Sequence, residues 1–339
     1  MKTRHVLLFF FSATIFLACS SASNKRITPP EPPPPVDTSF GLVEKDVEYG
    51  TATDWTGAEV SLKMDIYLPT NIDTSKRYPL IVYLHGGGYN DGDKSTSEKK
   101  CRILADSGFV TATVNYRLGW SSGSEADPCD GDTTSFNEAS YRAVQDANAA
   151  IRHLLSKTDK YRIDTNWIFI TGSSAGATVA LGAAYMDDGF ARRRYPNELT
   201  TFGSLFTSGN RIRTTYGIKG ICAVAGALVD SNLINSERAY PTITFQGQED
   251  MVIPIDQGTF MDCPGYLTFY GSLCQYRQLT RFGQTAVANF LPDAGHGDNG
   301  EAGFTDEFMM GNAACFFHRI IRGNPPGSAI YLGTQYNCD

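Results

Sequence analysis

The stretch that decides the fold of this chain is Trp167-Ile168-Phe169-Ile170-Thr171-Gly172-Ser173-Ser174-Ala175-Gly176. Its apolar start predicts a buried strand, and the alanine-rich residues that follow predict a helix over 175–186. Ser174 lies at the turn between the two elements, with one glycine two positions before it and another two positions after it. A turn of this kind is sharp and strained, so the flanking positions tolerate almost no side chain. Ser174 is therefore a candidate nucleophile, because a serine hydroxyl becomes reactive when a base removes its proton and donors stabilise the oxyanion.

Strands and helices alternate along the rest of the chain, which has 339 residues and is 42% hydrophobic and 19% charged. Alternation and apolar runs predict strands over 42–49, 60–68, 78–84, 109–116, 167–171, 218–225, 241–246 and 285–291. Helical periodicity predicts helices over 96–107, 138–156, 175–186 and 304–321. This order predicts an α/β fold with a mostly parallel, doubly wound sheet of about eight strands. Helices should cover both faces, and two antiparallel strands should begin the sheet.

A single domain is expected over 41–339. Two long segments, 117–137 and 187–217, follow strand ends and interrupt the alternation. Because open α/β sheets bind ligands outside the carboxyl ends of their strands, we expect these insertions to shape the entrance to a site. The formal net charge of −7, with scattered Lys and Arg, argues against a nucleic-acid partner. No C-x-x-C, H-E-x-x-H or P-loop motif occurs, so neither a metal nor a nucleotide cofactor is expected.

Residues 1–18 have the features of a signal peptide. Lys2 and Arg4 precede an apolar run over 6–18, which is short for a bilayer span but has the length of a signal core. The chain is therefore expected to be exported.

A lipid anchor is the expected outcome of this export. The sequence Phe-Leu-Ala-Cys-Ser over 16–20 resembles a bacterial lipoprotein box, with phenylalanine where leucine is commonest. The resemblance implies acylation of Cys19 and an outer-membrane or cell-surface position, with the proline-rich residues 19–40 as a tether. The alternative is ordinary cleavage after Ala18 or Ala22, with release into the periplasm or the medium.

Export also makes disulfides available, and seven cysteines follow Cys19. An odd number leaves at least one thiol free, and the candidate is Cys222, inside the apolar strand 218–225. Cys263 and Cys274 bracket a short loop containing Gly and Tyr, so we expect a disulfide between them. The remaining four allow several pairings: Cys101, Cys129, Cys315 and Cys338.

A second motif, His85-Gly86-Gly87-Gly88-Tyr89, directly follows the predicted strand 78–84. It is similar to the HGGG oxyanion motif of α/β-hydrolase esterases and lipases. Residues 63–69 and 114–117 resemble segments of the hormone-sensitive-lipase-like and carboxylesterase branch, and the similarity covers nearly all of the predicted domain. The resemblance implies an α/β-hydrolase fold and an oxyanion hole built from the N–H groups of Gly87, Gly88 and Ala175. Consecutive glycines suit that role, because their N–H groups can face a negative charge with no side chain in the way.

His296 is the candidate base, by elimination among five histidines. It alone lies in a flexible turn, residues 293–297, after the last predicted strand. A catalytic imidazole needs such a loop, because its ring must reach the serine hydroxyl. The other histidines are expected to be structural or to lie in the signal segment: His5, His85, His153 and His318.

The chain order of the resembled fold is Ser, then Asp or Glu, then His. Residues 246–254, Gln-Gly-Gln-Glu-Asp-Met-Val-Ile-Pro, resemble the family's H-G-x-x-D-x-x-V-P segment, which implies that Asp250 is the acid. Gln246 stands where the family has His, a change expected to affect packing rather than chemistry. Glu249 and Asp230 are the rival acids.

The candidate triad and the resemblance imply a serine carboxylesterase that forms an acyl-enzyme and needs no cofactor. No large apolar lid is evident, which favours a short acyl group, and export favours acetyl or feruloyl esters of polysaccharide. The alternatives are a serine peptidase of the same fold and a non-catalytic binding protein. Asp146 and Arg117 are expected to be architectural, and Ser173 is expected to be part of the turn rather than a nucleophile.

Overall fold

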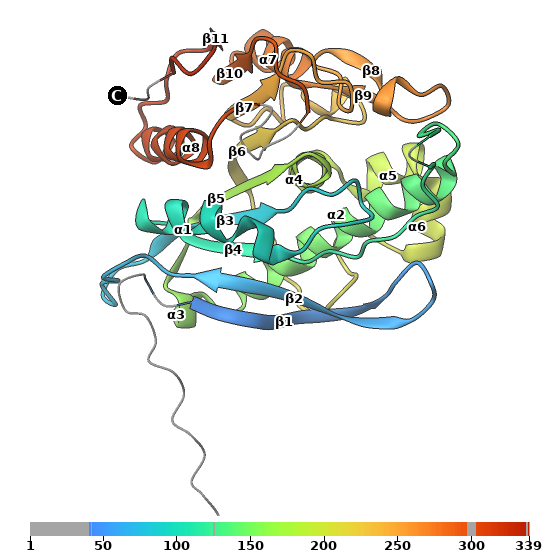
Figure 1. Ribbon diagram of the computed structural model, residues 1–339. Helices are drawn as coiled ribbons and strands as arrows, with labels where there is room; N and C mark the ends of the chain where they lie inside the picture. The colour runs from blue at the N-terminus through green and yellow to red at the C-terminus, as the bar shows by residue number, and fades with distance from the viewer. Residues whose placement is uncertain (1–40, 42, 125, 297–302, 337, 339) are drawn as a thin grey trace, which may run out of the picture. The chain divides into compact units, whose positions relative to one another are not determined.

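A sheet of nine strands forms the centre of the protein (Figure 1). The computed structural model describes residues 41, 43–124, 126–296, 303–336 and 338, so the predicted signal peptide, the tether and Cys19 lie outside the described residues. The strand order is β1-β2-β4-β3-β5-β6-β7-β10-β11. The strands are β1 Val43–Thr53, β2 Glu59–Tyr67, β3 Tyr78–Leu84, β4 Val110–Val114, β5 Ile163–Ser173, β6 Ile218–Val224, β7 Thr242–Gly247, β10 Ala286–Leu291 and β11 Ala329–Leu332. β2 is antiparallel to both of its neighbours, and all other neighbouring pairs are parallel.

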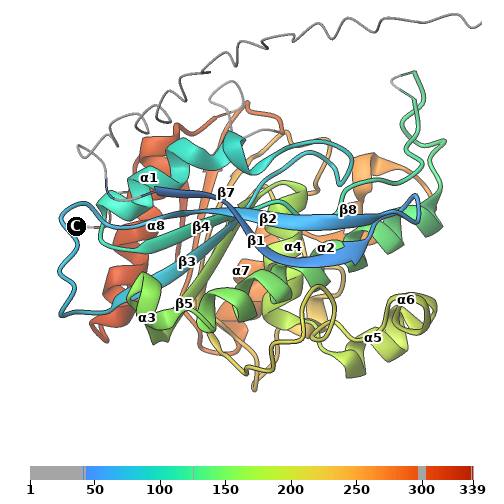
Figure 2. The same cartoon turned by 90° about the horizontal axis from the view of Figure 1, so that it is seen from below.

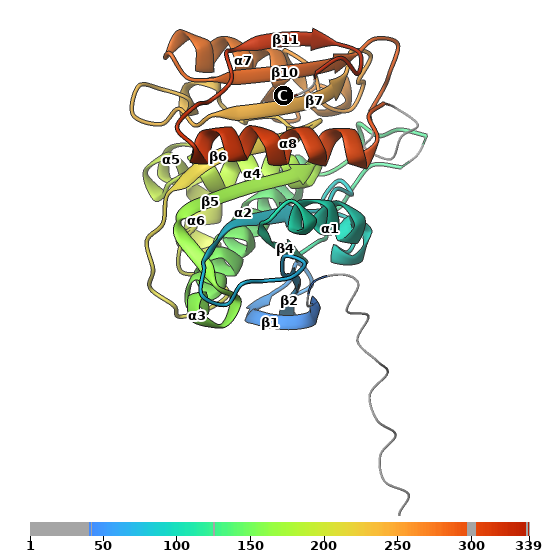
Figure 3. The same ribbon diagram turned by 90° about the vertical axis from the view of Figure 1, so that its left-hand side faces the viewer.

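Helices cover both faces of this sheet, as predicted. α1 (Glu98–Asp106) and α8 (Asp306–Ile321) lie on one face, toward the viewer in Figure 3. α2 (Thr133–Leu155), α4 (Ala175–Tyr185) and α7 (Ser272–Arg281) lie on the other (Figure 2). The shorter helices are α3 Thr158–Tyr161, α5 Asp188–Arg194, α6 Pro196–Phe202 and the 3-10 helices η1 Lys94–Ser97, η2 Ser231–Leu233 and η3 Phe260–Asp262. Within the described ranges, every helix is too short or too polar to cross a bilayer.

Strand β3 shows why both faces are covered. Leu80, Val82 and Leu84 pack into the apolar cluster on the α2 and α4 side, whereas Ile81 and Tyr83 pack into the cluster on the α1 and α8 side. Successive side chains of a strand point to opposite faces, so a continuous apolar run requires burial on both. The predicted doubly wound α/β fold is confirmed.

All eight predicted strands are present, and the structure adds short elements that the sequence pattern did not reveal. β11 extends the sheet by a ninth strand, and β8 (Gln257–Thr259) pairs with β9 (Thr268–Tyr270) in a separate hairpin. α5 and α6 lie within the predicted insertion 187–217. In the first insertion, the Asp132 side chain accepts hydrogen bonds from the N–H groups of Thr134 and Ser135. This N-cap starts α2 at residue 133, earlier than predicted.

The predicted disulfide between Cys263 and Cys274 is wrong. Cys263 is bonded to Cys129, and Cys315 is bonded to Cys338. Cys129 lies in the first insertion, 134 residues before its partner, so local spacing carried no signal of this pairing. Among the described cysteines, three are free: Cys101, Cys222 and Cys274. The prediction of a buried free thiol at Cys222 is confirmed, and burial raises the pKa of this thiol to about 12.

Candidate active site

Ser174 sits at the sharp turn between β5, the middle strand of the sheet, and α4. Its φ of 53° and ψ of −123° place a residue with a side chain in a strained backbone conformation. The flanking glycines permit the close packing around the turn. A Cβ atom at Gly176 would lie 2.2 Å from the carbonyl oxygen of Leu84, and one at Gly172 would lie 2.5 Å from the backbone of Gly176. The Ser174 N–H donates to the carbonyl of Val224 at 2.8 Å, which ties the turn to the next strand.

The structure brings Ser174, His296 and Asp250 together at the carboxyl ends of β5, β10 and β7. His296 Nε2 lies 2.8 Å from Ser174 Oγ. His296 Nδ1 lies 2.8 Å and 3.0 Å from the two carboxylate oxygens of Asp250. The Asp250 side chain is fully buried and the His296 side chain is 19% exposed. A serine hydroxyl, an imidazole and a buried carboxylate therefore form one continuous hydrogen-bonded line.

Two loops must approach closely for this line to form, and Gly247 makes the approach possible. A Cβ atom there would lie 2.3 Å from the carbonyl oxygens of both Ala294 and Gly295, in the loop that carries the histidine. The Glu249 N–H also donates to the Ala294 carbonyl at 2.8 Å. The loop after β7 is thus fastened to the loop after β10.

The surroundings of Asp250 separate it from its rivals. Its Oδ1 accepts hydrogen bonds from the N–H groups of Val252 and Ile253, both at 2.9 Å. Glu249 is exposed, and Asp230 accepts a hydrogen bond from the Asn232 N–H at the start of η2. Of the three acidic candidates, Asp250 is the one that the structure places against the imidazole.

Gln246 is expected from sequence to affect only packing, but its side chain contacts Asp250 directly. Its Nε2 donates to Asp250 Oδ2 at 3.1 Å and to the Ile253 carbonyl at 2.8 Å. Its Oε1 accepts a hydrogen bond from the Ser272 hydroxyl at 2.7 Å. Gln246 is buried, so these bonds fix both the amide and the carboxylate beside it.

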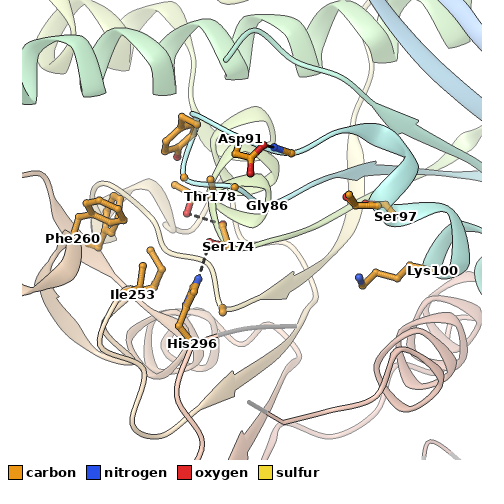
Figure 4. A pocket seen from close by; sticks show the side chains of 18 residues that line it. Gly86, Asp91, Ser97, Lys100, Ser174, Thr178, Ile253, Phe260 and His296 are labelled. Atoms are coloured by element: carbon orange, nitrogen blue, oxygen red, sulfur yellow. Dashed lines mark hydrogen bonds between the residues drawn. The ribbon is translucent and has the colours of Figure 1, made fainter. Parts of the chain in front are cut away.

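A cavity of about 490 Å³ opens in front of Ser174 and is lined by Gly86, Gly87, Gly88, Ala175 and His296 among others. The three predicted oxyanion-hole residues therefore border the same space as the serine and the histidine. Figure 4 shows two sides to this space: Ile253 and Phe260 lie on one side of Ser174, and Ser97 and Lys100 lie on the other. One side is apolar and the other carries a hydroxyl and a cation.

Other residues singled out in the sequence lie in structural positions. His85 is buried and its ring stacks on Tyr116 with centroids 4.5 Å apart, and burial lowers the pKa of its imidazole. Ser173 shares a hydrogen bond of 2.5 Å with the Tyr83 hydroxyl. The side chains of His85 and Ser173 are buried, and neither is part of the line of hydrogen bonds at Ser174.

Arg117 and Asp146 form a buried ion pair. The guanidinium donates to both carboxylate oxygens of Asp146 at 2.8–3.0 Å, and the Arg117 N–H donates to the same carboxylate at 2.8 Å. Arg117 Nη1 also donates to the Thr53 carbonyl at 2.9 Å. Burial lowers the pKa of Arg117, but the negative charge of Asp146 outweighs it and the net pKa is raised. The pair joins α2, the end of β1 and the start of the first insertion.

The mostly parallel sheet, the serine turn after its middle strand and the side chains at neighbouring strand ends define the α/β-hydrolase fold. Solved structures agree. A truncated form of a carbohydrate esterase from gut microbiota has a TM-score of 0.58 with this chain at 18% identity, covering 84% of this chain and 98% of that one. Thermogutta terrifontis esterase 2 phosphorylated by paraoxon has a TM-score of 0.58 at 17% identity, covering 86% and 97%. These likenesses show the shared fold.

Sequence comparisons also match this chain to esterases. Residues 64–204 match the family BD-FAE, and this segment holds the HGGG loop and Ser174. Carboxylesterase 3B of Mus musculus is 30% identical over 148 residues, which are 42% of this chain and 23% of that protein. Esterase LipI of Mycobacterium tuberculosis is 30% identical over 119 residues, 34% of this chain and 31% of that protein. The chain thus spans less than a third of these relatives' length. The resemblance to α/β-hydrolase esterases and lipases is confirmed.

Proposed function

We propose that the protein is a serine carboxylesterase. The observation that carries this proposal is the line of hydrogen bonds from the Ser174 hydroxyl through His296 to the buried Asp250, at the edge of a cavity that the glycine-rich loop also lines. A serine beside an oriented imidazole is the arrangement that activates a hydroxyl for attack on a carbonyl. The esterase names of the relatives and of the fold neighbours support the same reaction.

The reaction proceeds in two halves. His296 Nε2 accepts the Ser174 proton as Oγ forms a bond to the ester carbonyl carbon, and the carbonyl oxygen becomes an oxyanion facing the N–H groups of the oxyanion loop and Ala175. The carbon–oxygen bond to the alcohol then breaks, and His296 donates its proton to the departing oxygen. A water molecule adds to the acyl-enzyme while giving a proton to His296, and the acid leaves as Ser174 Oγ recovers that proton. Asp250 orients the ring and stabilises its cationic form.

The proposed substrate is an ester with a short acyl group on a hydroxyl-rich alcohol. The apolar side of the cavity includes Ile253 and Phe260, which suit an acyl group, and the other side includes Ser97, which can bind a hydroxyl group. Asp91 also lines the cavity and can accept hydrogen bonds from hydroxyl groups. The likeness to a carbohydrate esterase supports acetyl or feruloyl esters of polysaccharide as the natural class.

Chain-length preference tests this proposal. We expect kcat/KM for p-nitrophenyl acetate to exceed that for the palmitate ester by more than about 10-fold, because the Phe260 ring occupies the apolar side of a cavity of about 490 Å³. The Phe260→Ala variant should raise kcat/KM for the butyrate ester relative to acetate by roughly 15-fold, since butyrate has two more CH₂ groups and each newly buried CH₂ contributes about 0.8 kcal/mol. Initial rates across an acyl series measure both effects.

The control is Phe282→Ala, which removes the same ring from the exposed end of α7 and should leave the acyl preference unchanged. A wild-type preference for palmitate over acetate would contradict the short-acyl proposal. An acyl profile of Phe260→Ala identical to that of Phe282→Ala would remove Phe260 from the acyl-binding side.

The two alternatives make different demands. A serine peptidase of this fold would cleave peptide p-nitroanilides as well as esters, and an ester-only profile rejects it. A non-catalytic binding protein would give neither activity nor labelling by a fluorophosphonate. The continuous hydrogen-bonded line at Ser174 favours the esterase over both.

We also propose that the chain is exported and anchored by a lipid on Cys19. The two disulfides support an oxidising compartment. Cells expressing the full chain and fed an alkyne-tagged fatty acid should label the protein, and Cys19→Ser should abolish the label and move the protein out of the membrane fraction. Cys274→Ser is the matched control, because Cys274 is a free thiol within the described part of the chain. Labelling that persists in Cys19→Ser would exclude this anchor.

A further inference from the structure

The oxyanion loop contains three consecutive residues with left-handed backbone conformations. Their φ values are 116° at Gly87, 58° at Gly88 and 63° at Tyr89. Glycine adopts such values without penalty, but Tyr89 carries a side chain and does not. A strained backbone of this kind persists only where the surrounding structure fixes it. The loop must therefore be held from outside.

Residues 119–120, at the start of the first insertion, hold the loop with three hydrogen bonds. The Gly119 N–H donates to the Tyr89 carbonyl at 2.7 Å, and the Trp120 N–H donates to Asn90 Oδ1 at 2.9 Å. The Trp120 indole N–H donates to the Gly88 carbonyl at 2.8 Å. This third bond is made by a side chain, so it depends on the identity of the residue.

Trp120 is itself held rigidly. It is 6% exposed, and its ring packs edge-on against Phe136 of α2 and against Tyr266, with centroid distances of 4.9 Å and 6.1 Å. The disulfide between Cys129 and Cys263 joins the same insertion to the segment that contains Tyr266. An anchored ring gives the indole N–H a fixed position, so its hydrogen bond can determine where the loop lies.

We propose that Trp120 is a positioning residue for the oxyanion hole. Its indole N–H holds the Gly88 carbonyl and thereby stabilises the left-handed backbone that presents the N–H groups of Gly87 and Gly88 to the oxyanion. The inference rests on the proposed esterase function. Trp120 acts through Gly88 rather than on the substrate, so its effect belongs to the transition state, in which the oxygen is charged, more than to the ground state.

The Trp120→Phe variant tests this role, because it keeps an aromatic ring in the cluster and removes the N–H. We expect kcat for p-nitrophenyl acetate to fall about 10-fold, less than the loss for deleting an oxyanion donor outright, with KM changed less than twofold. Ser174 Oγ adds to the carbonyl carbon of a trifluoromethyl ketone as the serine proton passes to His296, and the ketone oxygen becomes an oxyanion. In Trp120→Phe, the inhibition constant of the ketone should rise by the same factor as kcat/KM falls. The inhibition constant of the matching alcohol, which forms no oxyanion, should not change.

Trp167→Phe is the matched control. Trp167 lies in β5 and stacks on Phe169, in the apolar cluster on the α1 and α8 side of the sheet. Trp167→Phe should therefore change neither kcat nor the inhibition constant of the ketone. If Trp120→Phe folds and keeps wild-type kcat and ketone affinity, the inference is wrong. A fall in binding of the ketone and the alcohol alike would also overturn it, since that pattern indicates a general distortion of the cavity.

A second variant carries the test if Trp120→Phe does not fold. The substitution Trp120→β-(3-benzothienyl)alanine keeps the fused ring and puts sulfur in place of the indole N–H, so it removes only the donor to the Gly88 carbonyl. The same separation between ketone and alcohol binding is expected, and its absence rejects the inference. Failure of the proposed function has a different signature: the wild-type protein then hydrolyses no ester and binds the ketone no more tightly than the alcohol.

Discussion

Ser174→Ala should lower kcat for p-nitrophenyl acetate by about 10⁴-fold or more, and it should abolish covalent labelling by a fluorophosphonate. The reason is that the Ser174 hydroxyl is the one that His296 Nε2 contacts, at 2.8 Å. Without Oγ there is no acyl-enzyme, and water must attack the ester with help from the oxyanion loop alone. Rates are measured by release of p-nitrophenolate, and the labelled residue is identified by mass spectrometry of the digested protein.

The adjacent serine gives an unusually close control. Ser173→Ala makes the same substitution one residue earlier, where the hydroxyl shares a hydrogen bond with Tyr83, whereas the imidazole contacts Ser174. Ser173→Ala should keep its labelling at Ser174 and most of its activity. Labelling retained in folded Ser174→Ala protein, or lost in folded Ser173→Ala protein, would contradict the assignment of the nucleophile.

The parts of the fold that sequence predicted well are those with strong local patterns. Residues 78–84 are one continuous apolar run, and the predicted strand matches β3 at both ends. β11, by contrast, has four residues that alternate between half-buried and exposed, too short a pattern to separate from a loop. The hairpin of β8 and β9 has three residues in each strand and gave no signal at all.

The same distinction between local patterns and tertiary packing applies to the residues of the site. Ser174 and the glycine loop are local motifs, and they could be found without knowing the fold. Asp250 and Glu249 are neighbours in the chain, and what separates them is a tight turn in which the N–H groups of Val252 and Ile253 donate to Asp250 Oδ1. The pairing of Cys129 with Cys263 and the bond from Trp120 to Gly88 arise from tertiary packing. Neither leaves a pattern in the spacing of residues.

Asp146→Asn should destabilise the protein by about 3 kcal/mol, because it leaves the Arg117 guanidinium buried without a counter-charge. The side chains of both residues are 3% exposed or less, so water cannot replace the lost carboxylate. The Arg117 N–H would also lose a charged acceptor. Urea denaturation followed by tryptophan fluorescence measures the loss, and the thermal midpoint should fall by on the order of 5 °C.

The expected loss of stability is large because the ion pair is buried. An exposed Arg–Asp pair serves as the control, because breaking it changes the same kind of contact without burial. Asp159→Asn breaks the contact with Arg77, but the Asp159 side chain is 88% exposed, so this variant should unfold at the wild-type urea concentration. The double variant Arg117→Met/Asp146→Leu removes the stranded charge as well and should recover part of the stability lost in Asp146→Asn. If Asp146→Asn unfolds like Asp159→Asn, the buried pair does not hold the insertion. If the double variant is less stable than Asp146→Asn, the hydrogen bonds from Arg117 to the Thr53 carbonyl and to α2 contribute more than the burial of its charge costs.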